Sequence, residues 1–289
     1  MGADRKDVGG IIRPTMRRLL AAVCLSGVLA LALPLAPVIA HAGAQAAAPA
    51  PANTRAWIEK RAEIEAYLKV APIVRTDGTS VGVTHPVHAF FAPGGLVESA
   101  SWKAITPGTY GGFHESYLSE IAGYELDKFL GLGMVPPTVE RDVDGKKGAM
   151  IMWVPQTKNF KEAGGMPTPP PIQQARWQIQ VMRTKMFDNL IGNIDPNLGN
   201  WLFDPNWTII LIDHSRAFVG EQKVPHTIEH VDATLWAKFL ALDEATLSGA
   251  LTGLVERGEI RAMLQRRDAM KKTVEQLVKK NGEAAVILK

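Results

Sequence analysis

The chain has 289 residues, with 32 lysines and arginines against 29 aspartates and glutamates, which gives a formal net charge of +3. Removal of residues 1–42, which we expect, takes away five basic and two acidic residues and the only cysteine, Cys24, so the remaining 247 residues are neutral. A neutral chain without cysteine excludes disulfides and thiolate chemistry, and it argues against nucleic acid or an anionic membrane surface as a partner.

The amino-terminal segment has the features of a secretory signal peptide. Arg17 and Arg18 precede an apolar run at 19–40, and the A-x-A sequence at 40–42 fits a cleavage site. An uncleaved anchor is the alternative, because the run is long enough to span a bilayer, although two prolines within it favour cleavage. We therefore expect an exported protein, periplasmic or secreted, or one anchored in the membrane by residues 19–40. An alanine- and proline-rich linker at 43–54 follows the leader.

Residues 55–156 are predicted to form a small lobe that is rich in strands. Apolar residues at helical spacing and glycines between short apolar runs distinguish its helices from its strands. In chain order the predicted elements are a helix at 55–70, antiparallel strands between 77 and 105 with a turn at 93–95, a helix at 116–132, and strands at 138–141 and 148–154. Ser116 is a candidate cap for the second helix.

Residues 157–289 are predicted to form a second, helical lobe. A loop rich in glycine and proline at 157–171 leads into a strong helix at 173–190, and a hairpin follows this helix. Beyond Glu221 the pattern predicts helices only. The whole is an α+β arrangement of two lobes, and the join between lobes is the natural place for a ligand.

Short polar side chains gather around the predicted hairpin. A turn signal at 204–206 lies between two apolar runs, so Asn200 before the first strand and Asp213 after the second should meet. Such oxygen ligands suit Mg²⁺ or Mn²⁺, which take their remaining ligands from phosphate and water. Asp195, on the preceding loop, could orient a hydroxyl and accept its proton. The alternative is a polar hairpin in which these residues are only structural.

The spacing D-x-x-x-x-N from Asp195 to Asn200, with Asp213 thirteen residues later, resembles the catalytic loop and metal-binding aspartate of the protein-kinase-like superfamily. The stretches "FDNLIGNIDPNLGNWLFD" and "LIDHSRAF" look most like its atypical members: the HipA-type kinases, the phosphatidylinositol 3- and 4-kinases and the secreted Golgi casein kinase group. The resemblance implies a two-lobed kinase-like fold, Asp195 as the catalytic residue, and Asn200 and Asp213 as ligands of Mg²⁺ or Mn²⁺.

Further patches of the same resemblance lie upstream, in the expected order. "SASWKAI" resembles the strand with the nucleotide-binding lysine, which makes that residue Lys103, and Glu120 would be its partner on the following helix. "GAMIMWV" resembles the strand that enters the hinge, with Met152 near the adenine. No G-x-G-x-x-G sequence occurs, so the turn that covers the phosphates has only Gly78 and Gly82 as candidates.

The resemblance implies transfer of a phosphoryl group from ATP to a hydroxyl of a protein or small molecule. His214 and Ser215 stand where protein kinases have phenylalanine and glycine, which leaves the substrate and the level of activity open. One alternative is a catalytically inactive kinase-fold binding or scaffold protein of the cell envelope. Another is transfer of AMP at the same site, and a third is an exported structural protein that binds no nucleotide.

Overall fold

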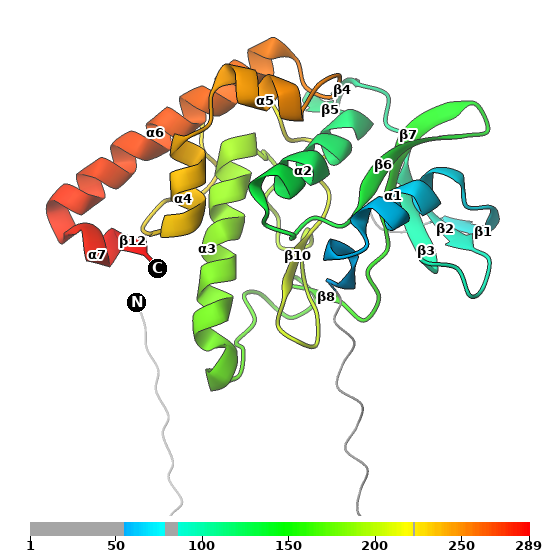
Figure 1. Ribbon diagram of the computed structural model, residues 1–289, viewed down its shortest axis with the longest axis horizontal. Coiled ribbons are helices and arrows are strands. Elements are labelled where there is room, and N and C mark those ends of the chain that lie inside the picture. The colour runs from blue at the N-terminus through cyan, green and yellow to red at the C-terminus, as the bar shows by residue number, and fades with distance from the viewer. Residues whose placement is uncertain (1–54, 79–85, 222) are drawn as a thin grey trace, which may run out of the picture. The chain divides into compact units, whose positions relative to one another are not determined.

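The computed structural model describes residues 55–78, 86–221 and 223–289, all of which belong to one compact unit (Figure 1). The predicted leader and linker and the candidate Gly82 lie outside the described residues. Within the described ranges, no helix is both long and apolar enough to cross a membrane.

A five-stranded sheet forms the amino-terminal part of this unit, and every neighbouring pair of its strands is antiparallel (Figure 1). Its order is β1 (Ile73–Gly78), β2 (Val87–Phe91), β3 (Ser99–Lys103), β7 (Lys146–Met152) and β6 (Thr138–Val143). The predicted antiparallel strands are confirmed, and so is the turn at 93–95, where Gly94 has a φ of +79° that favours glycine. β1 starts earlier than the sequence pattern indicated.

The two faces of this sheet pack against different helices. On one face Phe91, Ala100 and Met150 pack with Leu68 of α1 (Arg61–Val70). The other face carries Ala149 and Ile151, which pack against the first turns of α2 (Tyr117–Leu130). The predicted helix at 55–70 is interrupted, because the buried Trp57 lies on a separate 3-10 helix, Ala56–Ile58, before α1.

The helix α2 begins and ends as the sequence predicts. The Oγ of Ser116 accepts a hydrogen bond from the amide of Leu118 at 3.0 Å, and Gly131 ends the helix with a φ of +67°. A hairpin of β4 (Gly108–Tyr110) and β5 (Phe113–Glu115) precedes the helix. The sequence did not predict this hairpin, since its three-residue strands are too short to show a period.

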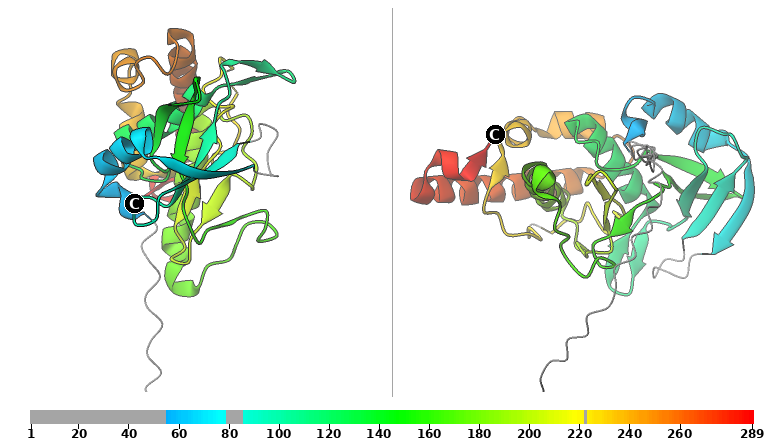
Figure 2. Two further views of the ribbon diagram at one scale, coloured as in Figure 1. Left: turned by 90° about the vertical axis from the view of Figure 1, so that its right-hand side faces the viewer. Right: turned by 90° about the horizontal axis from the view of Figure 1, so that it is seen from below.

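Helices dominate the carboxy-terminal part, as predicted. They are α3 (Gln174–Ile191), α4 (Ala233–Leu240), α5 (Glu244–Ala250), α6 (Arg257–Asn281) and α7 (Glu283–Val286). The long α6 packs against α3, and the right-hand view of Figure 2 shows it running across that helix, which is seen nearly end-on. The expectation of helices only beyond Glu221 is wrong, because β11 (Val231–Asp232) pairs in parallel with β12 (Ile287–Leu288). Two-residue strands so far apart in sequence form only through tertiary packing.

The predicted hairpin is present after α3. β9 (Trp201–Phe203) pairs with β10 (Ile209–Leu211), and β8 (Lys158–Asn159), within the predicted loop at 157–171, adds a third strand. The turn is structural, because the Oδ1 of Asp204 accepts a hydrogen bond from the amide of Thr208 at 2.7 Å. The chain thus has a mixed architecture with a strand-rich part followed by a helical part.

Candidate active site

Three charged side chains from three distant segments meet beside the sheet. The Nζ of Lys103, at the end of β3, donates to the Oε1 of Glu120 at 2.6 Å and to the Oδ1 of Asp213 at 2.8 Å. Lys103 and Glu120 are buried, with exposed fractions of 7% and 2%, whereas the Asp213 side chain is 38% exposed. The lysine therefore joins α2 to the end of the β9–β10 hairpin, and the aspartate presents one side of the cluster to solvent.

The opposite charges in this cluster shift the pKa values of Lys103 and Asp213 in directions that keep both groups ionised. Burial alone would lower the pKa of Lys103, but the carboxylates of Asp213 and Glu120 outweigh it and raise that pKa above its usual range. Burial opposes the charged form of Asp213 as well, yet the Lys103 ammonium holds the pKa of this carboxyl below its usual value. At neutral pH Lys103 is thus a cation and Asp213 an anion.

The segment after β10 is held against α2 by more than the ion pair. The second oxygen of Glu120, Oε2, accepts a hydrogen bond from the amide of His214 at 2.9 Å. The His214 ring is buried against Gly123, where an added Cβ would lie 3.0 Å from the ring, and burial lowers the pKa of this histidine. Asp213 itself has a φ of +63°, which is costly for a residue other than glycine and persists because these contacts hold it.

The loop before the hairpin brings Asp195 and Asn200 close to the chain segment that carries Asp213. The Nδ2 of Asn200 donates to the carbonyl of Asp195 at 3.2 Å, and the amide of Ile212 donates to the carbonyl of Asn200 at 3.1 Å. Asn200 therefore lies beside the residue that precedes Asp213. The Nδ2 of Asn197 donates to the Oδ1 of Asp195 at 2.9 Å and orients its carboxylate.

Arg216 is a residue that the sequence interpretation missed. Its Nε and Nη2 donate to the Oε1 of Glu115 at 2.8 Å and 2.5 Å, and its Nη1 lies 3.4 Å from the Oδ2 of Asp195. Its guanidinium also lies over the ring of Phe113, 4.9 Å from the centroid. Arg216 thus connects the β4–β5 hairpin to Asp195. The arginine stands within the quoted stretch "LIDHSRAF", but its buried partner Glu115 is a hundred residues upstream and gives no local signal.

The oxygen donors near Asp213 fit a divalent cation that also binds phosphate. The Oδ1 of Asp213 accepts hydrogen bonds from Lys103 and from Ser215, so its Oδ2 is the atom available to a metal. The Nδ2 of Asn200 is engaged, which leaves its amide oxygen. In the described ranges no group of three or more histidine, cysteine, aspartate or glutamate side chains is placed to hold a metal. A cation bound here needs ligands from elsewhere, as Mg²⁺ and Mn²⁺ do in phosphate sites.

The positions of the remaining candidates, Met152 and Gly78, give less support for a role in the site. Met152 is the last residue of β7, and its amide donates to the carbonyl of Pro137 at 2.9 Å. Gly78 ends β1, and an added Cβ there would meet no atom within 4 Å, so no close contact requires a glycine at this position. No contact of either residue links it to Lys103 in the described part of the chain.

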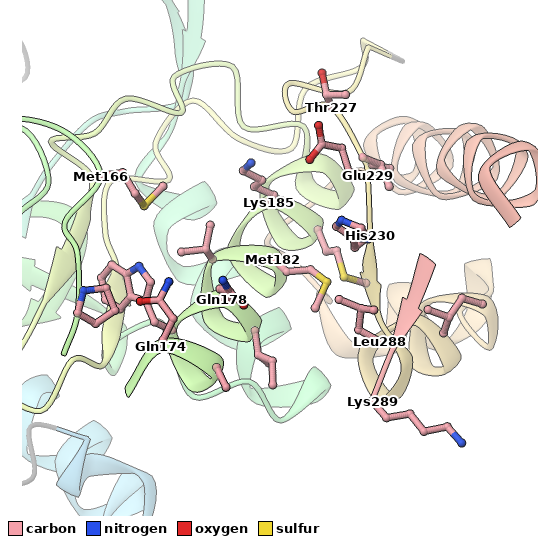
Figure 3. Close-up of a pocket in the computed structure, with 18 of the residues that line it drawn as sticks. Met166, Gln174, Gln178, Met182, Lys185, Thr227, Glu229, His230, Leu288 and Lys289 are labelled. Carbon is pink, nitrogen blue, oxygen red and sulfur yellow. The ribbon is translucent and has the colours of Figure 1, made fainter. Parts of the chain in front are cut away.

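A large apolar groove lies elsewhere, along the outer side of α3 (Figure 3). Its volume is about 1030 Å³, and Figure 3 shows Met182, Lys185, Glu229 and Leu288 among the residues that line it. None of the candidate residues named above lines this groove. The charged cluster and the groove are therefore separate features.

No family model matches the chain, and no curated protein matches it by sequence. Solved structures do match. The crystal structure of the Golgi casein kinase is 16% identical with a TM-score of 0.57, and the match covers 79% of this chain and 78% of that one. The same kinase with Mn and ADP bound is 15% identical, with a TM-score of 0.58 and coverage of 80% and 79%. A Fam20 protein from hydra, solved with sugar, is 16% identical with a TM-score of 0.62, covering 80% and 92%.

At such low identity these matches show the fold. The chain has the two-lobed, atypical protein-kinase-like fold that the resemblance predicted, with a sheet in its amino-terminal part and helices in its carboxy-terminal part. The roles of single residues depend on the geometry of this chain and are argued below.

Proposed function

We propose that the chain is an atypical kinase that transfers the γ-phosphoryl group of ATP to a hydroxyl of a protein or small molecule. One observation carries the proposal: Lys103 of the sheet lies between Glu120 of α2 and Asp213 of the hairpin, at 2.6 Å and 2.8 Å. A phosphate-binding lysine needs such a carboxylate partner to hold its ammonium in a partly buried site. The match to the structures of the Golgi casein kinase supports the same reading.

The residues of the site have distinct tasks in this reaction. Lys103 binds the α- and β-phosphates, and Glu120 holds Lys103 in place. Asp195 orients the acceptor hydroxyl and takes its proton, while the acceptor oxygen forms a bond to the γ-phosphorus and the bond to the β-phosphate oxygen breaks. Asn197 keeps the Asp195 carboxylate in position through its hydrogen bond of 2.9 Å.

Asn200 and Asp213 would hold a divalent cation, Mg²⁺ or Mn²⁺. Both have an oxygen that no hydrogen bond of the described residues occupies, and the match to a kinase with Mn and ADP bound supports this assignment. Such a cation supplies positive charge that stabilises the phosphate oxygens during transfer.

We also propose that the protein works outside the cytoplasm. The leader at 1–42 is the basis of this proposal, and the match to a Golgi kinase agrees with it. If the leader is cleaved, the protein is released into the periplasm or the medium. If it is retained, residues 19–40 anchor the protein in the membrane.

Nucleotide binding is the first test. We expect ATP with Mn²⁺ at ten times its dissociation constant to raise the melting temperature of the purified protein by about 3–5 °C. Asp213→Asn keeps the acceptor for Lys103 but loses the charge, so it should abolish the metal-dependent part of this rise. Asp243→Asn is the matched control, because asparagine caps α5 as well as the aspartate does. A full rise in Asp213→Asn contradicts the metal assignment.

Labelled ATP separates the competing functions. Label from the γ-phosphate in a product supports the kinase, whereas label from the α-phosphate supports AMP transfer by the same residues. Nucleotide binding without transfer to any acceptor or to water supports an inactive binding or scaffold protein. The absence of any rise in melting temperature at millimolar ATP, with either metal, contradicts the proposed function.

A further inference from the structure

An aromatic stack lies on the sheet near Lys103, and the proposed reaction does not use it. The ring of His88, on β2, and the indole of Trp153, just after β7, are stacked with centroids 4.0 Å apart and an angle of 20° between planes. Phe90 contacts the same imidazole, at 4.1 Å between centroids. Segments far apart in the sequence thus build one aromatic surface.

The strand register places this stack on the same face of the sheet as Lys103. His88 lies opposite Ser101, and Ser101 is two residues before Lys103 on β3, so all three side chains share one face. The amide of Trp153 donates to the carbonyl of Ser99 at 3.0 Å, which continues the pairing of β7 with β3 past Met152. Ser99, which lies opposite Trp153, is four residues before Lys103, about 13 Å along the strand, the scale of a base, a ribose and two phosphates.

The stack is open to solvent on one side. The Trp153 side chain is 44% exposed, and it is the tryptophan that the fold leaves most accessible. α2 covers the part of the face around Ala149 and Ile151, not Trp153. A large aromatic ring supported on one side and exposed on the other is the arrangement that binds a flat ligand by stacking.

The charges around the stack are already paired. Arg75 lies over the ring of Phe90 and forms an ion pair with Asp77, which stands opposite His88 in the register. The Nε2 of His88 is buried without a hydrogen-bond partner, and burial lowers the pKa of this histidine. The surface therefore offers a neutral aromatic face rather than a charge for the ligand.

We infer that Trp153, backed by His88, is the platform on which the base of the nucleotide stacks while Lys103 binds its phosphates. This inference depends on the proposed function. Every base has a π face, so stacking contributes affinity without selecting one base over another. The platform would then accept adenine and guanine alike, and any discrimination between them would come from hydrogen bonds elsewhere.

A comparison of ATP with inorganic tripolyphosphate tests the platform directly, since the second ligand has phosphates but no base. With Mn²⁺ present, we expect Trp153→Leu to weaken the binding of ATP and of GTP by about tenfold each. The affinity for tripolyphosphate should not change. Trp153→Phe retains a stacking ring and should keep most of the affinity for ATP. Phe129→Leu is the matched control, because Phe129 of α2 is 47% exposed and should affect no ligand.

The outcomes separate this inference from the proposed function. If the unchanged protein binds neither ATP nor tripolyphosphate, the proposed function fails and the platform fails with it. If the unchanged protein binds ATP and Trp153→Leu binds it equally well, the platform alone is wrong. An equal loss for ATP and tripolyphosphate would show a general structural defect. A gain in ATP affinity would show that the indole occupies the place of the base. The equal loss and the gain would each overturn the inference.

Discussion

Glu120 lies in the first turn of α2 and Asp127 in the last, and both carboxylates are almost completely buried. Glu120 contacts a lysine at 2.6 Å and the amide of His214 at 2.9 Å. The Oδ1 of Asp127 instead accepts from the amides of Met134 and Val135, at 2.8 Å and 3.2 Å, and its Oδ2 has no hydrogen-bond partner. The guanidinium of Arg61 lies 3.7 Å from this Oδ2.

The same helix thus holds one carboxylate for the site and one for the fold. Glu120 restrains Lys103, to which we assign phosphate binding, whereas Asp127 accepts hydrogen bonds from the chain that follows the helix. Burial raises the pKa of Asp127 to about 6, because it outweighs the backbone amides and the nearby arginine, which lower this pKa. Changes at the first turn should therefore affect chemistry, and changes at the last turn should affect stability and its dependence on pH.

The largest expected effect is at Lys103. Lys103→Arg keeps a positive charge for Glu120, but a planar guanidinium cannot replace the compact ammonium. We expect transfer to fall by about 10²–10³-fold while the melting temperature changes little. Lys147→Arg, at an exposed ion pair on the same sheet, is the control for the substitution. Near-normal transfer in Lys103→Arg would show that the reaction does not require this lysine.

The pH dependence of stability is the second test. The folded protein holds the Asp127 proton up to about pH 6, whereas the unfolded chain releases it near its ordinary pKa of 3.8. The folded state then binds more protons in this window, so the contribution of Asp127 to stability falls as the pH rises from about 4 to 6. Asp127→Asn cannot titrate. Relative to the unchanged protein, the free energy of unfolding of Asp127→Asn should therefore rise by up to about 3 kcal/mol over this window.

Urea unfolding at several pH values between 4 and 7 measures that gain. The difference in free energy of unfolding between Asp127→Asn and the unchanged protein should grow up to about pH 6 and then stay constant. A difference that does not vary with pH would show that Asp127 titrates alike in the folded and unfolded states, contrary to the effect expected from burial.

The loss of the amide acceptor at Asp127 should have a smaller effect. Asp127→Ala removes the oxygen that serves Met134 and Val135, and it should be less stable than Asp127→Asn by about 2 kcal/mol. Both variants lack the charge, so their difference measures the lost hydrogen bonds together with the lost packing of a buried side chain. Transfer activity below the unfolding temperature should stay the same in both. A large loss of activity in Asp127→Ala would mean that the two ends of α2 are not separable.

The smallest effect concerns Arg216, next to the first turn of α2. Arg216→Lys keeps a charge for the buried Glu115 but cannot reach Asp195 at the same time. We expect transfer to fall by about tenfold, with nucleotide binding unchanged, because Arg216 contacts Asp195, whereas we assign phosphate binding to Lys103. Arg257→Lys, at the exposed pair with Glu244, is the control. A weaker nucleotide affinity in Arg216→Lys would point to a disturbance of the whole site instead.

Local patterns predicted the elements that are stabilised locally. Ser116 caps α2, Gly94 occurs at the predicted turn, and Asp204 closes the turn of the β9–β10 hairpin, because each acts on neighbours a few residues away. The pairing of β11 with β12 was missed, since two residues have no periodicity and their partners lie more than fifty residues apart. The β4–β5 hairpin was missed because its strands have only three residues each.

By itself the sequence determined which residues are candidates for the chemistry. The spacing of Asp195, Asn200 and Asp213 around a hairpin is local, and hairpin pairing places Asn200 beside Ile212, the residue before Asp213. Only the tertiary structure decided how Lys103 and Glu120 reach Asp213, and that Arg216 joins Glu115 to Asp195. These contacts connect segments about a hundred residues apart, and the free energy that forms them comes from packing the sheet and α2, which no short stretch of sequence encodes.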